Sequence, residues 1–537
     1  MPSFNLLSSR WISAVTLDGK PDLLSLSDVL RNANDLRCVQ GEAPIVTAAL
    51  YRLLIAFLHR VHQGPASEEE WAELWANGVD AERLEAYEAA HWDEFWLLGG
   101  DRPFHQCPDL ADVPWKPATH LVLYRAKGNN TTLHDHTTDD EWPAFPPDAA
   151  ARWLVTLQTF DTGGTKTPCR PGGVKSSKAG PGNYFGTVLL EGETLWETLL
   201  LNTVVYDPGA GRPLATTTPQ DRAIWEREQP PGPEPIAKAF PKGWVDLLTW
   251  PSRRILLHGE GEDRRVNVDG VVVAPGTELG VELHTVEAMA AFHKREDKKL
   301  TYDPVRLEIL RGVWRHATDL LLPAQERGGR RRPQTIEEVA WLVQLGYLDE
   351  RKTVTLRVFG QKLMPNPGAV EYWSEDALPI KLALLRVHDE WNLEQLFGRA
   401  VTLADAVGRE LDRMVANYHE GLRSRFDARK YRSFLAERYW PRLDAEFALL
   451  LHDLSELVIR IEPEALDGWV EIRRLFERWG RYVGVTARAA VHTWIDDFPG
   501  GSPRQVLEAA RAEMILVGAL NKLSDAYQHE IRQFTGW

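Results

Sequence analysis

Two histidines flank an aspartate in the segment His134-Asp135-His136, and two more carboxylates follow at Asp139-Asp140. Imidazole nitrogens and carboxylate oxygens are common metal ligands, so this segment is a candidate centre for a metal-dependent phosphohydrolase. Such an enzyme needs further ligands from separate helices, and the sequence offers no matching second doublet. The polar run Gly128–Thr132, which is rich in turn-forming residues, precedes the segment and favours an ordinary loop.

A second candidate combines glycines with a lysine in Asp161-Thr162-Gly163-Gly164-Thr165-Lys166. The spacing differs from the GxxxxGK[ST] pattern of a nucleotide-binding loop. Paired glycines let a backbone approach a ligand closely, and the lysine adds a positive charge. A similar stretch follows at Gly172–Lys178. The residues alone fit either a ligand-contacting loop or a flexible surface loop.

A third candidate is basic. Between Lys294 and Arg332 there are eleven Lys and Arg residues against six Asp and Glu residues, whereas the whole chain carries a formal net charge of −15. Most charge runs are solvated surfaces. The reversal of sign within an acidic chain makes a phosphate-facing surface the more interesting hypothesis.

The bulk composition narrows the class of protein. A chain of 537 residues is expected to form two or three domains, and the acidic charge argues against indiscriminate coating of nucleic acid. Three dispersed cysteines predict neither a disulfide framework nor a cysteine-rich metal site. We expect no signal peptide, no membrane span and a cytoplasmic location. The residues point to no catalytic centre and require no cofactor.

The expected elements divide the chain near residue 378. Residues 1–378 predict a mixed α/β domain with a strong helix over 45–61, a hairpin around 259–269 and a strand over 354–358. After Pro379, helical periodicity predicts four long helices over roughly 384–424, 428–461, 464–496 and 503–534. Short turns between them predict a C-terminal four-helix bundle over residues 379–537, and hence an α+β chain.

Several segments, in order, resemble the CasA (Cse1) family, the large subunit of the type I-E CRISPR surveillance complex Cascade. The start resembles that family's "NLL…WI" pattern, and later segments resemble its "RPF-x-Q" and "LFETLLLN" motifs. The matching segments are Asn5–Leu7 with Arg10–Ile12, Ser25–Leu30, Arg102–Gln106, Gly128–Thr137 and Leu195–Asn202.

The resemblance implies a non-catalytic subunit with no cofactor. Its expected partners are the CRISPR RNA (crRNA), the other Cascade protein subunits, double-stranded target DNA and the Cas3 nuclease-helicase. The subunit would recognise the protospacer-adjacent motif (PAM) in the duplex, promote its opening and recruit Cas3 in antiviral defence. Glycines and a lysine suit this task because the narrow minor groove carries a degenerate code.

The resemblance also places the contacting residues. It implies a glycine loop, a lysine finger, a wedge that separates the strands and a loop that approaches the crRNA or the motif. The family commonly has Asn-Gln and a small residue at the wedge, whereas this chain has Asn-Pro-Gly. The expected glycine loop is Phe160, Asp161, Thr162, Gly163, Gly164 and Lys166; the finger is Lys298 or Lys299, with Lys294 as a further register; the wedge is Asn366, Pro367 and Gly368; and the crRNA or motif loop contains Asn129, Asn130 and Thr131.

Some relatives carry a cysteine cluster in the central hairpin, but residues 259–269 contain none, so we expect no metal there. Two alternatives stay open at this point. One is the phosphohydrolase that uses His134, Asp135 and His136. The other is a pure assembly scaffold whose loops touch no DNA.

Overall fold

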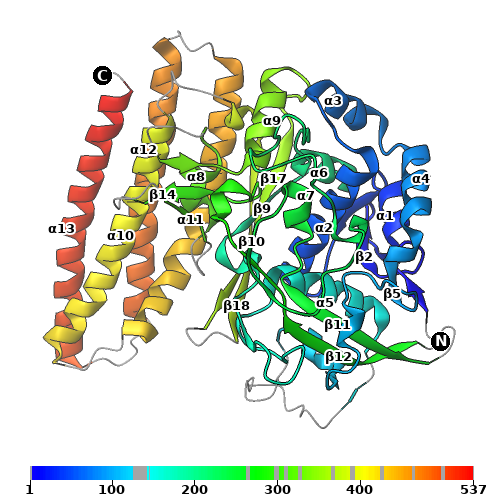
Figure 1. Ribbon diagram of the computed structural model, residues 1–537. Coiled ribbons are helices and arrows are strands. Elements are labelled where there is room, and N and C mark those ends of the chain that lie inside the picture. The colour runs from blue at the N-terminus through cyan, green and yellow to red at the C-terminus, as the bar shows by residue number, and fades with distance from the viewer. Residues whose placement is uncertain are drawn as a thin grey trace. The chain divides into compact units, whose positions relative to one another are not determined.

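The computed structural model of the chain describes residues 3–124, 142–143, 145–261, 266–295, 301–306, 312–323, 329–364, 369–386, 393–423, 428–461, 466–496 and 502–535. The chain forms two compact units. Unit 1 comprises residues 1–307, 325–339 and 355–375, and unit 2 comprises residues 308–324, 340–354 and 376–537. Unit 1 mixes helices and short sheets, and unit 2 is dominated by long helices (Figure 1).

Helix α2 (Pro44–His62) is the core of unit 1. Pro44 occupies the first helical turn, where its missing N–H costs nothing, and Gln63 ends the helix in the left-handed conformation. The helix packs against α4, α5, α6 and α7. It is long and apolar enough to cross a membrane by length and composition alone, but 94% of that stretch is buried inside the protein. The expected helix over 45–61 is therefore confirmed as a buried core helix.

The other helices of unit 1 surround α2 or join the short strands to one another (Figure 1). They are α1 (Leu26–Arg31), α3 (Glu68–Asn77), α4 (Ala81–His91), α5 (Pro147–Phe160), α6 (Leu195–Asn202) and α7 (Trp244–Leu248), and α9 (Gln334–Gln344) crosses from unit 1 to unit 2.

Three small sheets carry most of the strands that matter for the site. Their orders are β3-β2-β4, β11-β12-β6 and β18-β17-β9. The second contains the expected central hairpin, in which Leu256 pairs with Val272. The strands are β2 (Ile12–Thr16), β3 (Pro21–Leu24), β4 (Leu36–Val39), β6 (Lys116–Pro117), β9 (Thr187–Glu191), β11 (Arg253–Glu260), β12 (Asn267–Pro275), β17 (Thr353–Leu363) and β18 (Val370–Lys381).

The remaining strands are short, and several lie beside loops discussed below. They are β1 (Phe4–Asn5), β5 (Trp96–Leu98), β7 (Gly164–Thr165), β8 (Ser176–Ser177), β10 (Ile236–Ala239), β13 (Thr277–Leu279), β14 (Phe292–Lys294), β15 (Tyr302–Pro304) and β16 (Arg330–Arg331).

A buried ion pair joins α2 to the segment that precedes β14. Both guanidinium nitrogens of Arg52 lie 3.0 Å from the carboxylate oxygens of Glu287, and both side chains are almost completely excluded from solvent. The guanidinium also lies near the rings of Phe185 and Trp244. A bidentate pair of this kind fixes relative orientation, because either charge alone would be unpaired in an apolar interior.

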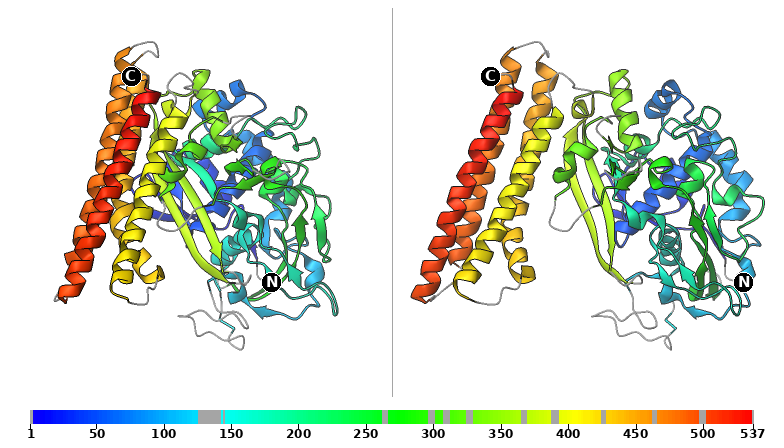
Figure 2. Two further views of the ribbon diagram at one scale, coloured as in Figure 1. Left: turned by 90° about the vertical axis from the view of Figure 1, so that its left-hand side faces the viewer. Right: turned by 60° about the vertical axis from the view of Figure 1, so that its left-hand side comes forward.

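Unit 2 contains four long helices: α10 (Leu393–Gly421), α11 (Ala428–Arg460), α12 (Leu466–Asp496) and α13 (Pro503–Phe534). They run beside one another for much of their length (Figure 2). A capping box begins α13: the Ser502 hydroxyl accepts a hydrogen bond from the Gln505 N–H, the Gln505 side chain accepts one from the Ser502 N–H, and Pro503 is the first helical residue. The first helix begins at Leu393 rather than at residue 384, because residues 382–385 form a separate 3₁₀ turn. The short helix α8 (Ala317–Leu320) also belongs to this unit.

Aromatic side chains with a polar tip connect these helices. Tyr439 on α11 and Trp479 on α12 donate hydrogen bonds to backbone carbonyls of α10, and Tyr527 on α13 donates to a carbonyl of α12. Their apolar rings are buried at the same contacts. At Gly480 an added Cβ would lie 2.7 Å from the Tyr527 ring, so glycine is what permits this close approach of α12 and α13. The packing of these helices is therefore fixed by specific polar contacts within an apolar interior.

Removal of one partner of the buried pair tests its role in unit 1. We expect Arg52→Met to lower the free energy of unfolding by about 3–5 kcal/mol, because Glu287 keeps its charge in a buried site without a partner. The double variant Arg52→Met/Glu287→Gln is expected to recover much of that loss. Urea unfolding followed by tryptophan fluorescence measures both, and equal losses in the two variants would contradict this explanation.

Candidate nucleic-acid interface

The expected glycine loop begins where α5 ends. Phe160 is the last helical residue, and Asp161 caps the helix C-terminus. The chain then forms the short antiparallel pair β7–β8, in which Gly164 faces Ser177 and Thr165 faces Ser176. We call residues 161–180 the glycine-loop segment, since it leaves α5 and returns to it.

The two glycines serve different purposes. Gly164 has φ +110°, a conformation that L side chains rarely adopt. A Cβ on Gly163 would lie 3.1 Å from the Ala179 N and 3.2 Å from the Ser177 O, so glycine there lets the two arms of the segment approach closely. Both glycines therefore shape the loop, and neither is an incidental linker residue.

A buried cluster of charges supports the loop from beneath. The Arg253 Nε lies 2.5 Å from the Asp161 carboxylate, and the Lys166 ammonium lies 2.7 Å from the same oxygen. Arg253 and Asp161 are almost completely buried. Burial lowers the pKa of Lys166, although the Asp161 carboxylate acts in the opposite direction. One carboxylate thus serves two cations in a solvent-poor site.

Arg253 also connects the two arms of the segment. Its guanidinium donates hydrogen bonds to the carbonyl of Thr162 (3.1 Å) on the outgoing arm and to that of Lys178 (2.7 Å) on the returning arm. The Asp161 carbonyl accepts a hydrogen bond from the Gly180 N–H (2.8 Å). The backbone geometry of the loop is therefore set before any ligand arrives.

This geometry separates supporting residues from residues that can reach a ligand. Phe160, Asp161, Thr162 and Gly163 are buried, and Lys166 is directed at Asp161 with 13% of its side chain exposed. The two residues of β7 are more open to solvent: Gly164 is half-buried, and Thr165 is exposed. The predicted set thus contains mostly the supports of the loop, and Thr165 lay outside it.

A hollow of about 510 Å³ lies beside the returning arm. It is lined by Ser176, Ser177 and Lys178 of that arm and by residues of β10, β13 and Trp250. Lys178 is exposed and is paired with Glu278, which also lines the hollow. The glycine-loop segment therefore has an open concave surface next to it.

The basic region is less available to phosphates than its composition suggests. Arg332 is buried and paired with Glu337 at 2.8 Å, and Arg331 stacks over the Tyr302 ring at 4.4 Å. Lys294 ends β14, the central strand of the sheet β15-β14-β16, and its side chain is exposed. Lys298 and Lys299 lie outside the described residues.

The strands that flank the expected wedge form a long hairpin. β17 pairs with β9 along residues 355–359, and the Met364 N–H donates to the Ala369 carbonyl at the end of the hairpin. Asn366, Pro367 and Gly368 fall between those two residues and lie outside the described part of the chain. Asn129, Asn130 and Thr131 lie outside it as well, and so do His134, Asp135 and His136.

One group within the described residues has metal-ligating atoms close together. His258, Glu260 and Asp269, on the central hairpin, bring one ligand atom each within 4.8 Å of one another. His258 Nδ1 lies 2.7 Å from an Asp269 oxygen, and this hydrogen bond accounts for their approach without an ion. His258 and Glu260 are exposed, and exposed groups of this kind commonly lie close together without a metal ion. The expectation of no metal in this hairpin stays a prediction.

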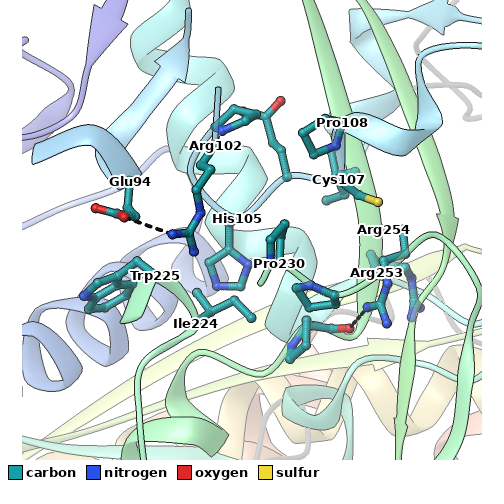
Figure 3. A pocket seen from close by; sticks show the side chains of 15 residues that line it. Glu94, Arg102, His105, Cys107, Pro108, Ile224, Trp225, Pro230, Arg253 and Arg254 are labelled. Carbon is teal, nitrogen blue, oxygen red and sulfur yellow. Dashed lines mark hydrogen bonds and ion pairs between the residues drawn. The ribbon is translucent and has the colours of Figure 1, made fainter. Parts of the chain in front are cut away.

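The Arg102–Gln106 motif lines a small pocket (Figure 3). Arg102 is paired with Glu94 at 3.1 Å, and His105 adopts φ +56°. The Nδ1 of His105 is shut off from solvent and has no hydrogen-bond partner among the described residues. Burial, with the guanidiniums of Arg227 and Arg254 nearby, lowers the pKa of His105 to about 3. This histidine is therefore neutral at physiological pH.

Arg253, Gln361 and Asn183, whose side chains hydrogen-bond to the backbone at the ends of the glycine-loop segment, were not among the predicted site residues. Arg253 is one of two arginines directly before the apolar run Ile255–Leu257, and Gln361 follows the apolar residues Val358 and Phe359. A charged or amide side chain within a predicted buried strand indicates a buried polar contact, and this pattern could have identified Arg253 and Gln361. No such pattern surrounds Asn183 in the sequence.

Comparisons with known proteins agree with this architecture. The sequence model of the CRISPR-associated protein Cse1 family matches residues 5–477. The chain is 30% identical over 511 residues to the CRISPR-associated protein CasA/Cse1 of Thermus thermophilus, covering 91% of this chain and 94% of that protein. This chain belongs to the Cse1 family.

Solved structures share the fold. The crystal structure of Thermobifida fusca Cse1 superposes with a TM-score of 0.80 at 26% identity, covering 98% of each chain. A chain of a CRISPR RNA-guided surveillance complex superposes with a TM-score of 0.74 at 21% identity, covering 96% of this chain and all of that one. The mixed α/β architecture with C-terminal helices is thus confirmed.

The neutral His105 gives a measurable pH dependence. Below pH about 6.5 the unfolded chain binds a proton on this ring, whereas the folded chain does so only near pH 3. Stability therefore falls as the pH falls through that window, by up to about 1.4 kcal/mol per pH unit from this group. We expect His105→Asn, which tolerates positive φ, to show a shallower decline of the urea midpoint between pH 6 and 4. Identical slopes for the two proteins would contradict this assignment.

Proposed function

We propose that this chain is the large subunit of a crRNA-guided DNA-surveillance complex, Cascade. Membership of the Cse1 family supports the proposal, and so does the fold shared with a chain of a CRISPR RNA-guided surveillance complex. Its partners would be the crRNA, the other Cascade protein subunits, double-stranded target DNA and Cas3. The subunit would be non-catalytic and cytoplasmic, and it would need no cofactor.

In this proposal unit 1 recognises the protospacer-adjacent motif. The observation that carries it is the preformed glycine-loop segment, whose backbone is held by Arg253 and whose short strand β7 presents Gly164 and Thr165. A preformed strand with a glycine and a small side chain can approach base edges in a narrow groove and loses little conformational entropy on binding. Base pairing with the guide would then read the rest of the target.

The lysine finger and the wedge complete the proposed interface. Lys294 is exposed at the end of β14, and Lys298 and Lys299 follow it by only a few residues. A lysine can donate hydrogen bonds to the acceptors that every base pair presents in the minor groove. Asn366, Pro367 and Gly368 would act at the end of the β17–β18 hairpin, where a wedge between base pairs would open the duplex.

Helices α10–α13 would form one four-helix bundle that contacts protein. The outer face of α13 exposes Val506, Leu507, Met514 and Ile515. Clustered exposed apolar residues are typical of protein-binding surfaces. The functional division into residues 1–378 for nucleic acid and 379–537 for protein partners, including Cas3 recruitment, follows from this proposal.

A gel-shift assay of the reconstituted guide-RNA complex tests the recognition role. Target duplexes that differ only in the flanking motif are compared with and without this subunit. We expect motif-dependent binding only when the subunit is present. If the subunit assembles but binding does not depend on the motif, the recognition role is contradicted and the scaffold interpretation is favoured. If the chain hydrolyses a phosphate ester with a divalent metal and His136→Ala abolishes this activity, the phosphohydrolase interpretation is favoured.

Two substitutions refine the test. We expect Gly163→Ala to weaken binding to motif-bearing duplex by about tenfold, because its Cβ would push the returning arm at Ser177 and Ala179 away from residue 163 and move the loop. Lys298→Ala/Lys299→Ala is expected to reduce the same binding with assembly intact. Gly232→Ala is the matched control: this glycine also lies in unit 1 outside the left-handed region, but it has open space where the added Cβ would be. An effect of Gly232→Ala equal to that of Gly163→Ala would contradict the loop's role.

A further inference from the structure

A hydrogen-bond network beneath the glycine-loop segment includes residues from the β17–β18 hairpin. Gln361, on β17, donates through its Nε2 to the Phe160 carbonyl (2.8 Å) and to the Asn183 side-chain oxygen (2.7 Å). Trp373, on β18, donates through its Nε1 to the Gln361 Oε1 (2.6 Å). Both polar ends of the Gln361 side chain are therefore bonded, and the residue is only 8% exposed.

Asn183 extends the network to the loop itself. Its Nδ2 donates to the carbonyls of Asp161 (3.1 Å) and Gly180 (3.0 Å), which are the two ends of the glycine-loop segment. Asn183 is 7% exposed. The two amide side chains thus form a continuous buried path from the hairpin strands to both ends of the loop.

The same tryptophan reaches a third segment. The Trp373 ring packs edge-on against the Tyr124 ring, with centroids 5.8 Å apart, and Tyr124 packs in the same way against Trp153 of α5. Tyr124 is the residue at which the expected crRNA or motif loop begins. Three segments that are far apart in the sequence therefore meet at Trp373 and Gln361.

Buried polar networks are stiff when every member is satisfied, and they fail as a unit when one member is removed. Gln361 lies three positions before Met364, so any displacement of the hairpin strands moves the groups that hold Phe160 and Asn183. The hairpin and the loop cannot shift independently without leaving buried hydrogen-bonding groups unpaired.

We propose that Gln361 and Trp373 are positioning residues that couple the glycine-loop segment to the β17–β18 hairpin, so that motif contact and strand separation occur together. The proposal rests on the recognition function proposed above and adds residues and a coupling that the family resemblance did not supply. Neither residue is expected to touch DNA. They act through the backbone of residues 160–161 and 180.

The test compares Gln361→Met and Trp373→Phe with a matched control, Gln106→Met. Gln106 is also a buried glutamine of unit 1 whose amide makes two hydrogen bonds to backbone, with Leu97 and Leu257. Methionine keeps the length of the side chain and removes its hydrogen bonds. Phenylalanine at 373 removes the Nε1 donor and keeps an aromatic ring against Tyr124.

Amide hydrogen exchange of the full chain is the first readout. We expect faster exchange at residues 161–166 and 175–180 in Gln361→Met and Trp373→Phe, and unchanged exchange there in Gln106→Met. Unchanged exchange in both network variants would overturn the coupling, whatever the chain's function is. If Gln361→Met fails to fold, the exchange of Trp373→Phe alone tests the coupling, and unchanged exchange in that variant overturns it.

The second readout is the ratio of affinities for motif-bearing and motif-free duplex in the assembled complex, together with strand opening reported by 2-aminopurine beside the motif. In both network variants we expect the affinity ratio to fall about tenfold and strand opening to decrease with it. In Gln106→Met we expect both quantities to stay unchanged. An equal fall in Gln106→Met would indicate general destabilisation and overturn the proposal. If the unmodified complex binds motif-bearing and motif-free duplex equally well, the proposed recognition function is overturned. The hydrogen-exchange result then tests the coupling between hairpin and loop by itself.

Discussion

The interaction on which the proposed interface depends is the buried pair between Arg253 and Asp161. Arg253 begins β11 of the central hairpin, and Asp161 ends α5, so the pair joins a sheet to a helix. The same guanidinium holds carbonyls on both arms of the glycine-loop segment. An isolated charge would be costly in this position, so each partner requires the other. Lys166 adds a second cation to the same carboxylate.

This arrangement explains how a loop rich in glycine can be rigid. Glycine loses more conformational freedom on folding than any other residue, so a glycine-rich turn needs outside support to hold one shape. Side chains remote in sequence provide this support. Arg253 of β11 hydrogen-bonds to the loop backbone, and Gln361 of β17 holds Asn183, which bonds to both ends of the loop. Strand β7 can then present its backbone and the small side chain of Thr165 to a ligand. The conformational entropy of ordering this strand has already been lost on folding, so little more is lost on binding.

Much of the fold could be predicted from sequence periodicity. The apolar stripe of the helix over 45–61 and the long amphipathic helices after Pro379 depend on local patterns, and the Ser502-Pro503 cap depends on two adjacent residues. The start of the first long helix was predicted too early, because the apolar run Leu382–Leu385 forms a 3₁₀ turn instead. Nothing in local periodicity distinguishes that turn from a first helical turn.

The site was harder to predict, for a physical reason. The sequence could indicate Gly163 and Gly164, because paired glycines mark a turn or a close approach of the backbone whatever the partner is. It could not show that Lys166 is directed inward at Asp161, or that Arg332 is buried against Glu337, because a charged residue's partner is set by tertiary packing. Arg253 and Gln361 lie about 90 and 200 positions from the loop that they support.

In the proposed function, strand β7 of the glycine-loop segment contacts the motif in duplex DNA. The most direct measurement places a photo-crosslinking amino acid at Thr165 in the assembled guide-RNA complex, with the same probe at the exposed Met514 of α13 as the control. We expect crosslinks from position 165 to base pairs of the motif, lost when the motif is scrambled, and none from position 514. Crosslinks from position 165 to protein alone, or to DNA without regard to the motif, would contradict it.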